Sequence, residues 1–231
     1  MRIAVLVSGG GTNLQALIDA GAAGQLGGGE LVRVISSKPG VYALERAAQA
    51  GIPAAVVARA DFKLAGPDSP PLEAFRLHQS AASTRANGDG FDRAMLAALA
   101  DCGAELVVLA GFLSILGPAV TAAYENRIIN VHPALIPSFC GRGFYGLRVH
   151  EAALAAGVKI TGATVHLVNE IPDGGAILLQ KAVPVLPDDT PETLQRRVME
   201  QAEWALLPQA VAAYCEGRIR LEDGRAYIDE R

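Results

Sequence analysis

Short apolar runs alternate with segments of helical spacing along most of the 231-residue chain, and this alternation limits the possible folds more than any other feature. Continuous runs such as Arg2–Val7 and Glu105–Ala110 are typical of strands buried on both faces of a parallel sheet. Segments with helical spacing lie between such runs, for example Leu14–Ala22 and Phe91–Asp101. The pattern predicts an α/β fold with a doubly wound, mostly parallel sheet flanked by helices.

The C-terminal part predicts a mixed continuation of this sheet. Two longer runs, Ile160–Val168 and Ala176–Val185, are separated by a short turn and should pair with each other. A helical stretch from Thr190 to Glu216 follows, with Thr190 as its N-cap, and Pro208 is expected to kink or interrupt it. The other expected elements are strands at Leu31–Ser36, Ile52–Val57 and Ile128–Val131, a helix at Tyr42–Ala50 and a terminal hairpin around Glu222–Arg225.

The length suits a single domain, residues 1–231, built from two halves. We expect residues 1–110 to form one half, which the glycine-rich turn described below makes a phosphate- or nucleotide-binding half, and residues 111–231 to form the second half. The stretch at about 63–90 is rich in Pro, Ser, Ala and Gly and lacks firm periodicity. We interpret it as a surface insertion with one short helix near Leu72–Ala82.

Composition excludes several classes of protein. The net charge of −4 argues against a general nucleic-acid binder, and no apolar run reaches the length of a membrane span. Met1 leads directly into the first strand, so we expect no secretory signal. Three isolated cysteines favour a reducing cytoplasm over a disulfide framework. No H-x-x-x-H or H-E-x-x-H pattern occurs, so we expect no metal site.

A glycine-rich turn, Ser8–Asn13, joins the first strand to the first helix. Backbone N–H groups at such a helix start, aided by the helix dipole, can hold a phosphate. The turn is not a Walker loop, because no Lys follows the glycines, and Leu14 replaces the third glycine of a dinucleotide fingerprint. A tight turn without a ligand is the alternative interpretation.

Asn130 and His132 stand two residues apart at the end of an apolar run, so on a strand both side chains point to the same side. Pro133 then ends the strand. An amide beside a protonatable imidazole can stabilise an oxyanion, which makes His132 the candidate catalytic histidine. Its alternative is a structural histidine, which is how we interpret His166 within its alternating strand.

Asp173 precedes Gly174 and Gly175 in the loop between the last two long runs. An Asp-Gly-Gly turn alone is a common structural device, but beside Asn130 and His132 its carboxylate would keep an imidazole charged. The segment Leu109–Leu116 is either core followed by a helix start or the edge of a pocket for a flat heterocycle.

Together, Ser8–Leu14, Leu109–Phe112, Asn130–Pro137 and Asp173–Gly175 resemble the phosphoribosylglycinamide formyltransferase family over nearly the whole chain. The resemblance implies a formyltransferase-type Rossmann-like fold, with residues 111–231 as the folate-binding and catalytic half. It also implies 10-formyltetrahydrofolate as co-substrate, glycinamide ribonucleotide as acceptor, no nucleic-acid or membrane partner, and a monomer or homodimer.

The family's functional residues carry over to particular positions. Gly11, Thr12 and Asn13 would hold the substrate's 5′-phosphate, and Glu203 would approach its ribose or glycinamide end. Asp173 would raise the pKa of His132, which acts with Asn130 on the formyl oxygen. The residues expected to bind the folate are Leu113, Ser114, Ile115, Leu116 and Asn130, with Arg85 as the candidate for its tail.

Two departures and three alternatives accompany this resemblance. The loop at 138–149 and the insertion are longer than in many relatives, so no role is assigned to His150. A 10-formyltetrahydrofolate hydrolase shares the catalytic trio but usually carries an N-terminal domain, and a methionyl-tRNA formyltransferase needs a basic C-terminal domain. A non-catalytic nucleotide-binding module would leave Asn130, His132 and Asp173 without a purpose.

Overall fold

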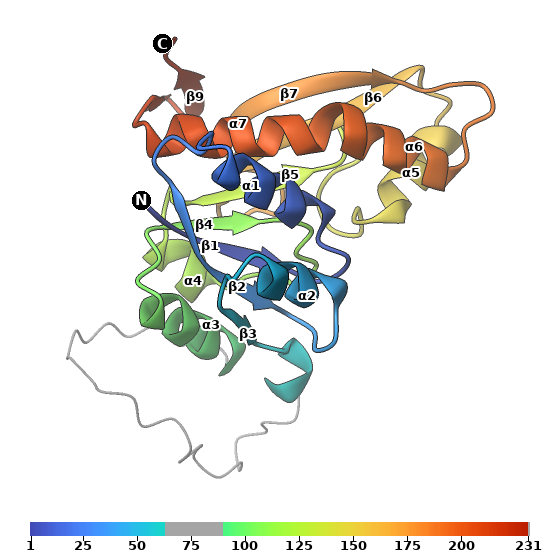
Figure 1. The fold of residues 1–231 in the computed structure, drawn as a ribbon. Coiled ribbons are helices and arrows are strands. Elements are labelled where there is room, and N and C mark those ends of the chain that lie inside the picture. Colours follow the sequence, from blue (N-terminus) through green and yellow to red (C-terminus); the bar gives the residue numbers. More distant parts are fainter. Residues whose placement is uncertain (63–89, 231) are drawn as a thin grey trace.

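The computed structural model describes residues 1–62 and 90–230. The expected insertion and its short helix lie outside the described residues, and so does Arg85. Figure 1 shows a twisted central sheet with helices on both faces. Its strands are β1 (Arg2–Val7), β2 (Glu30–Ser36), β3 (Ala54–Val56), β4 (Leu106–Leu109), β5 (Ile128–His132), β6 (Ile160–Leu167) and β7 (Ile177–Pro184).

The sheet has the order β3-β2-β1-β4-β5-β6-β7. Its first five strands are parallel, whereas β6 runs antiparallel to β5 and β7 runs antiparallel to β6. This confirms the α/β prediction with a mixed C-terminal part. A separate hairpin, β8 (Ile219–Glu222) and β9 (Arg225–Ile228), ends the described chain.

The helices cover the sheet unequally. They are α1 (Thr12–Ala22), α2 (Tyr42–Gln49), α3 (Gly90–Asp101), α4 (Pro118–Ala123), α5 (Leu147–Ala155), α6 (Pro191–Val198) and α7 (Trp204–Cys215), with the 3-10 turn η1 (Arg59–Phe62) and the π-helical turn η2 (Met199–Glu203). Figure 1 shows α3 and α4 on one face and α1 and α7 on the other. No helix in the described part of the chain is long and apolar enough to cross a membrane.

Two hydrophobic cores, one on each face, explain the continuous apolar run of β1. Ile3, Val5 and Val7 pack into the core under α1 and α7, while Ala4 and Leu6 pack into the core under α3. All five side chains have no exposed surface. Because successive strand residues point to opposite faces, a strand covered on both sides must be apolar at every position.

The sheet topology also fixes where a ligand can bind. The chain winds outward from β1 to β3 and then crosses back to β4, so the strand order reverses between β1 and β4. Connections leave the carboxyl ends of these two strands in opposite directions and open a crevice there. The glycine-rich turn, the segment after β4 and the end of β5 all meet at this edge.

Three predictions of local structure need correction. β3 covers only Ala54–Val56, and α5 forms within a segment that we treated as loop. The predicted helix break lies upstream of Pro208: the helix changes to the π turn η2, and α7 then runs through the proline. Pro208 lacks the N–H that would bond the carbonyl of Trp204 four residues earlier, and Trp204 is the first residue of α7, directly after the π turn.

Candidate active site

A cleft of about 380 Å³ lies at the carboxyl ends of β1, β4 and β5. One wall, which we call the phosphate wall, consists of the turn Gly9–Asn13 together with Met199 and Glu203 of η2. A second part of the lining, the catalytic wall, contains Asn130 and His132 of β5 and Asp173 of the loop between β6 and β7. The two sets of sequence-predicted residues therefore line the same cavity.

On the catalytic wall, strand register brings Asn130 together with His166. These residues are opposite each other in the antiparallel β5–β6 pair, and Asn130 Nδ2 lies 3.0 Å from His166 Nε2. His166 Nδ1 donates to the Leu167 carbonyl at 2.8 Å, since a carbonyl oxygen can only accept. His166 Nε2 is also 3.6 Å from Asp173 Oδ1. The interpretation of His166 as purely structural missed these contacts.

His132 is held from both ends of its ring. Its Nε2 donates to the Phe139 carbonyl at 2.9 Å, and its Nδ1 lies 3.6 Å from Asp173 Oδ2. Both ring nitrogens thus face oxygen acceptors, an arrangement that suits the doubly protonated imidazolium. The side chain is nevertheless buried, with 4% of the residue's surface exposed.

Burial decides the net pKa of His132. It lowers the pKa, and the neighbouring charge of Asp173 and the Phe139 carbonyl, which both raise it, do not make up the difference. The charge of Asp173 does raise the pKa of His132, as expected, but burial lowers it by more, so the net pKa is below the ordinary value of histidine. For Asp173 burial acts in the raising direction, but the contact with His166, the charge of His132 and the Gly141 amide together lower its pKa.

The backbone fixes the position of Asp173. Its φ of 56° lies in the left-handed region, and the Gly141 N–H donates to Asp173 Oδ2 at 2.8 Å. A Cβ at Gly175 would overlap the Leu167 carbonyl oxygen, so the chain packs against β6 at a distance that only glycine allows. The Asp-Gly-Gly sequence therefore serves a close backbone contact that aims a carboxylate at two imidazoles.

On the phosphate wall, the glycine-rich turn presents main-chain groups. Gly11 has a φ of 73° and precedes α1, which has no side-chain cap. The first N–H groups of a helix have no intrahelical partner, so those of α1 are available to an anion. A Cβ on Gly9 or Gly10 would have no other atom within 4 Å, which leaves room for a ligand to approach the backbone there.

Asn13 and Glu203 join the turn to η2. Asn13 Nδ2 donates to Glu203 Oε2 at 2.6 Å, and both residues are buried. Burial raises the pKa of Glu203 to about 7, against the opposing effect of the Asn13 hydrogen bond. Thr12 Oγ1 contacts Met199 Sδ at 3.6 Å. Asn13 lines the cleft, and its buried Oδ1, an acceptor, has no hydrogen-bond partner among the described residues.

The predicted pterin segment divides into exposed and buried residues. Leu113 and Ile115 are 49% and 58% exposed, and Leu113 lines the cleft. Ser114 is half-buried, whereas Leu116 packs into the core under α3. Ser8 Oγ accepts from the Leu113 N–H at 2.8 Å, which ties this segment to the end of β1.

Residues of the loop after β5 were missed by sequence reasoning. Phe139 and Gly141 hold the side chains of His132 and Asp173 through backbone groups, which no side-chain pattern reveals. His150 on α5 is fully buried, and neither of its ring nitrogens has a partner in the described part of the chain. Burial, followed by the charge of His132, lowers the pKa of His150 to about 4.

Comparison with known proteins identifies the class of this fold and cleft. The family model described as formyl transferase matches residues 1–211, and the chain therefore belongs to the formyl transferase family. Phosphoribosylglycinamide formyltransferase of Haemophilus influenzae is 39% identical over 228 residues, covering 99% of this chain and 93% of the relative. The enzyme of that name from Escherichia coli is 34% identical, with coverage of 99% and 94%.

A solved structure agrees with these relatives. Glycinamide ribonucleotide transformylase 1 from Symbiobacterium toebii superposes with a TM-score of 0.83 at 37% identity, covering 100% of this chain and 94% of the other. Within its family, this chain is thus an enzyme of the phosphoribosylglycinamide formyltransferase group, as its motifs predict.

Proposed function

We propose that the protein transfers a formyl group from 10-formyltetrahydrofolate to the amine of 5′-phosphoribosylglycinamide. The products are formylglycinamide ribonucleotide and tetrahydrofolate, in the de novo synthesis of purines. The observation that carries the proposal is a single cleft with two different walls. An uncapped helix start suited to a phosphate lines the same cleft as a cluster of amide, imidazole and carboxylate suited to acyl transfer.

The acceptor fits the phosphate wall. Gly11, Thr12 and Asn13 are proposed to bind the 5′-phosphate through the N–H groups at the start of α1 and through the Asn13 amide. Glu203, held next to Asn13, is proposed to bind the ribose or glycinamide end. The amine would then extend from this wall toward Asn130 and His132.

The donor fits beside the segment after β4. Leu113 exposes apolar surface at the cleft and Ile115, two residues on, is exposed as well, so a flat heterocycle could cover this segment. Leu116 supports this surface from the core, and Ser114 lies between the two exposed side chains. Arg85 remains the proposed partner of the folate tail. The donor supplies the formyl group, and the chain supplies position and charge.

The catalytic wall is proposed to stabilise the charge that develops during transfer. The amine attacks the formyl carbon, a new C–N bond forms, and the carbonyl oxygen becomes an anion. The Asn130 amide, which bonds His166 in the structure, would donate to this oxygen together with His132. The developing negative charge favours the imidazolium form of His132 against the effect of burial.

Collapse of the tetrahedral species completes the exchange. The bond between the formyl carbon and the donor nitrogen breaks, the donor nitrogen gains a proton from His132, and the acceptor amine loses one. Asp173, whose lowered pKa keeps it ionised beside His132, is proposed to hold a water through which the proton lost by the amine returns to His132. The proton count balances, and no covalent enzyme intermediate is needed.

A formyl-transfer assay with alternative acceptors tests the proposal. We expect product only when 5′-phosphoribosylglycinamide is present, with stoichiometric tetrahydrofolate. Formate release that does not depend on the amine would identify a hydrolase instead, and binding without turnover would identify a nucleotide-binding module. We place the reaction in the cytoplasm, in keeping with the three free thiols.

A further inference from the structure

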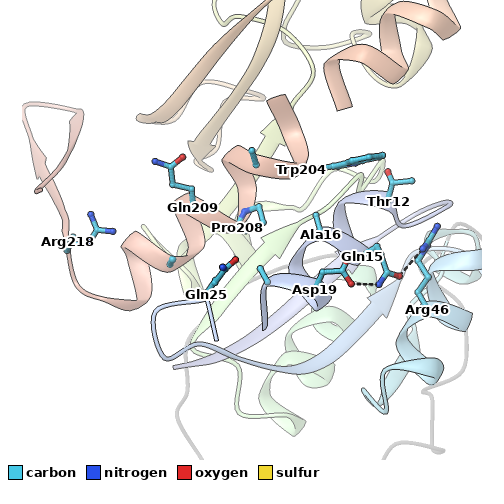
Figure 2. A pocket seen from close by; sticks show the side chains of 13 residues that line it. Thr12, Gln15, Ala16, Asp19, Gln25, Arg46, Trp204, Pro208, Gln209 and Arg218 are labelled. Carbon is cyan, nitrogen blue, oxygen red and sulfur yellow. Dashed lines mark hydrogen bonds between the residues drawn. The ribbon is translucent and has the colours of Figure 1, made fainter. Parts of the chain in front are cut away.

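Arg46 of α2 links the glycine-rich turn to α1 from outside the cleft. Its Nε donates to the Gly10 carbonyl at 2.9 Å, and its Nη1 donates to Gln15 Oε1 at 2.8 Å. Gln15 Nε2 in turn donates to Asp19 Oδ1 at 2.8 Å. Figure 2 shows Arg46, Gln15 and Asp19 as one chain of contacts along α1, in a groove that also includes Thr12.

Helix α2 contacts each of the three glycines of the turn. The Ala43 N–H donates to the Gly9 carbonyl at 3.1 Å, and Arg46 holds the Gly10 carbonyl. A Cβ on Gly11 would lie 2.7 Å from Ala43 Cβ and 3.3 Å from Arg46 Cδ. The turn is therefore fixed against α2, while the Cβ positions of Gly9 and Gly10 face open space.

The positive charge of Arg46 is not neutralised by these contacts. Both hydrogen bonds go to neutral acceptors, a backbone carbonyl and a side-chain amide. The Gln15 amide stands between the guanidinium and the Asp19 carboxylate. The ring of Tyr42 lies 4.9 Å from Arg46 Cζ and further restrains the side chain. Arg46 is half-buried, and the residue it contacts, Gly10, directly precedes the amides proposed to bind the phosphate. Its positive charge therefore attracts a phosphate dianion to this turn.

We infer that Arg46 is the positioning residue of the phosphate site: it fixes the turn so that the amides of Gly11, Thr12 and Asn13 converge, and its charge increases the affinity for the 5′-phosphate. It acts through Gly10 and Gln15 and not by contact with the substrate. This inference rests on the proposed function. Independent support for a ligand at the turn comes from Asn13, which is 7% exposed, lines the cleft and leaves its Oδ1 unpaired in the described structure; this acceptor suits an O–H or N–H group of the ligand whose phosphate takes the backbone N–H groups.

Three variants separate position from charge. Arg46→Gln removes the positive charge and the hydrogen bonds to Gly10 and Gln15. Arg46→Lys keeps the charge but cannot form both hydrogen bonds at once. Arg93→Gln is a matched control on the exposed surface of α3. Calorimetric titration with ribose 5-phosphate measures the phosphate site without requiring turnover. We expect about tenfold weaker binding for Arg46→Gln, about threefold for Arg46→Lys and no change for the control.

A second readout excludes a merely structural effect. In the formyl-transfer assay, Arg46→Gln should raise KM for 5′-phosphoribosylglycinamide about tenfold while kcat and the KM for the folate stay near those of the unaltered protein. With the dephosphorylated acceptor, glycinamide riboside, the variant and the unaltered protein should have equal kcat/KM. Selectivity for the phosphorylated acceptor would therefore fall about tenfold.

The outcomes are distinguishable. Equal losses with both acceptors, or unchanged ribose 5-phosphate affinity in Arg46→Gln, would overturn the inference. Failure of the unaltered protein to bind ribose 5-phosphate would overturn it as well. If the unaltered protein binds ribose 5-phosphate but transfers no formyl group, the proposed function fails while the titration still decides the role of Arg46.

Discussion

The two walls of the cleft are built in different ways. The phosphate wall is a continuous piece of chain: one strand end, one glycine-rich turn and one helix start, completed by Glu203. The catalytic wall combines side chains of β5 with Asp173 from the loop between β6 and β7, more than 40 residues away, and His166 of β6 and backbone groups of the loop after β5 contact them. Backbone supplies the binding capacity of the first wall, whereas side chains supply that of the second.

Because of this difference, the two walls should respond differently to substitutions. A wall made of main-chain groups tolerates changes of side chain as long as the backbone keeps its path, and it fails when a Cβ obstructs that path. A wall made of side chains loses its chemistry with one substitution while the fold survives. Four predictions test this contrast.

The largest effect is expected on the catalytic wall. His132→Ala and Asp173→Asn should each lower kcat by about 10²-fold or more, because they remove the proton donor or the charge that orients it. KM for the phosphorylated acceptor should change little, since its phosphate is proposed to bind the other wall. Steady-state kinetics measures the effect, with the exposed Asp188→Asn as a matched control. Near-normal turnover in both variants would refute the catalytic assignment.

The next effect contrasts two glycines. Gly175→Ala should destabilise the protein by about 3 kcal/mol, because its methyl group would overlap the Leu167 carbonyl and force the backbone that carries Asp173 to move. Gly9→Ala has free space and should leave the free energy of unfolding within about 0.5 kcal/mol while weakening ribose 5-phosphate binding. Chemical denaturation compares them, and equal stability of the two variants would count against the close backbone contact.

Glu203 should make stability depend on pH. The pKa of this carboxyl is about 7 in the folded protein against 4.5 as its ordinary value, so the unfolded chain releases its proton at lower pH. Folding stability should therefore fall by roughly 3 kcal/mol as pH rises from about 4.5 to about 7, and then level off. Glu203→Gln should lack this decline, and the exposed neighbour Glu200→Gln should retain it. Parallel declines in the Glu203→Gln variant and the unaltered protein would contradict the pKa assignment.

The smallest effect separates two leucines of the segment after β4. Leu116→Ala should lower the free energy of unfolding by about 2 kcal/mol, because Leu116 packs in the core. Leu113→Ala should barely affect stability but raise KM for the folate about threefold, since half of its surface is exposed at the cleft. Thermal unfolding and kinetics together give the result. Unchanged stability in Leu116→Ala would contradict the packing role of Leu116, and an unchanged folate KM in Leu113→Ala would contradict the folate contact of Leu113.

The sequence predicted the phosphate wall better than the catalytic wall, and the reason is the range of the contacts involved. The turn at Gly9–Asn13 and the pair Asn130 and His132 follow from local patterns, namely a strand end and a period of two. His166 could not be assigned in this way, because its contact with Asn130 depends on the antiparallel register of β5 and β6. Register between strands more than 30 residues apart leaves no short-range signal.

Backbone and burial effects explain the remaining differences. Phe139 and Gly141 act through main-chain groups, so their side chains gave no indication. Asp173 was correctly expected to favour the charged form of His132, but the larger cost of burial depends on three-dimensional packing. Leu116 was grouped with exposed neighbours because sequence alone does not show which apolar residue of a short segment faces the core.

The central claim is that the phosphate wall and the catalytic wall hold one acceptor between them. A crystal structure with ribose 5-phosphate and a folate analogue bound tests it most directly. We predict phosphate oxygens at the N–H groups of Gly11–Asn13, the heterocycle against Leu113, and the formyl-equivalent atom within about 3 Å of both Asn130 Nδ2 and His132. A phosphate bound elsewhere, or an Asn130 amide and a His132 ring still committed to His166 and Phe139 with both ligands in place, would contradict the account.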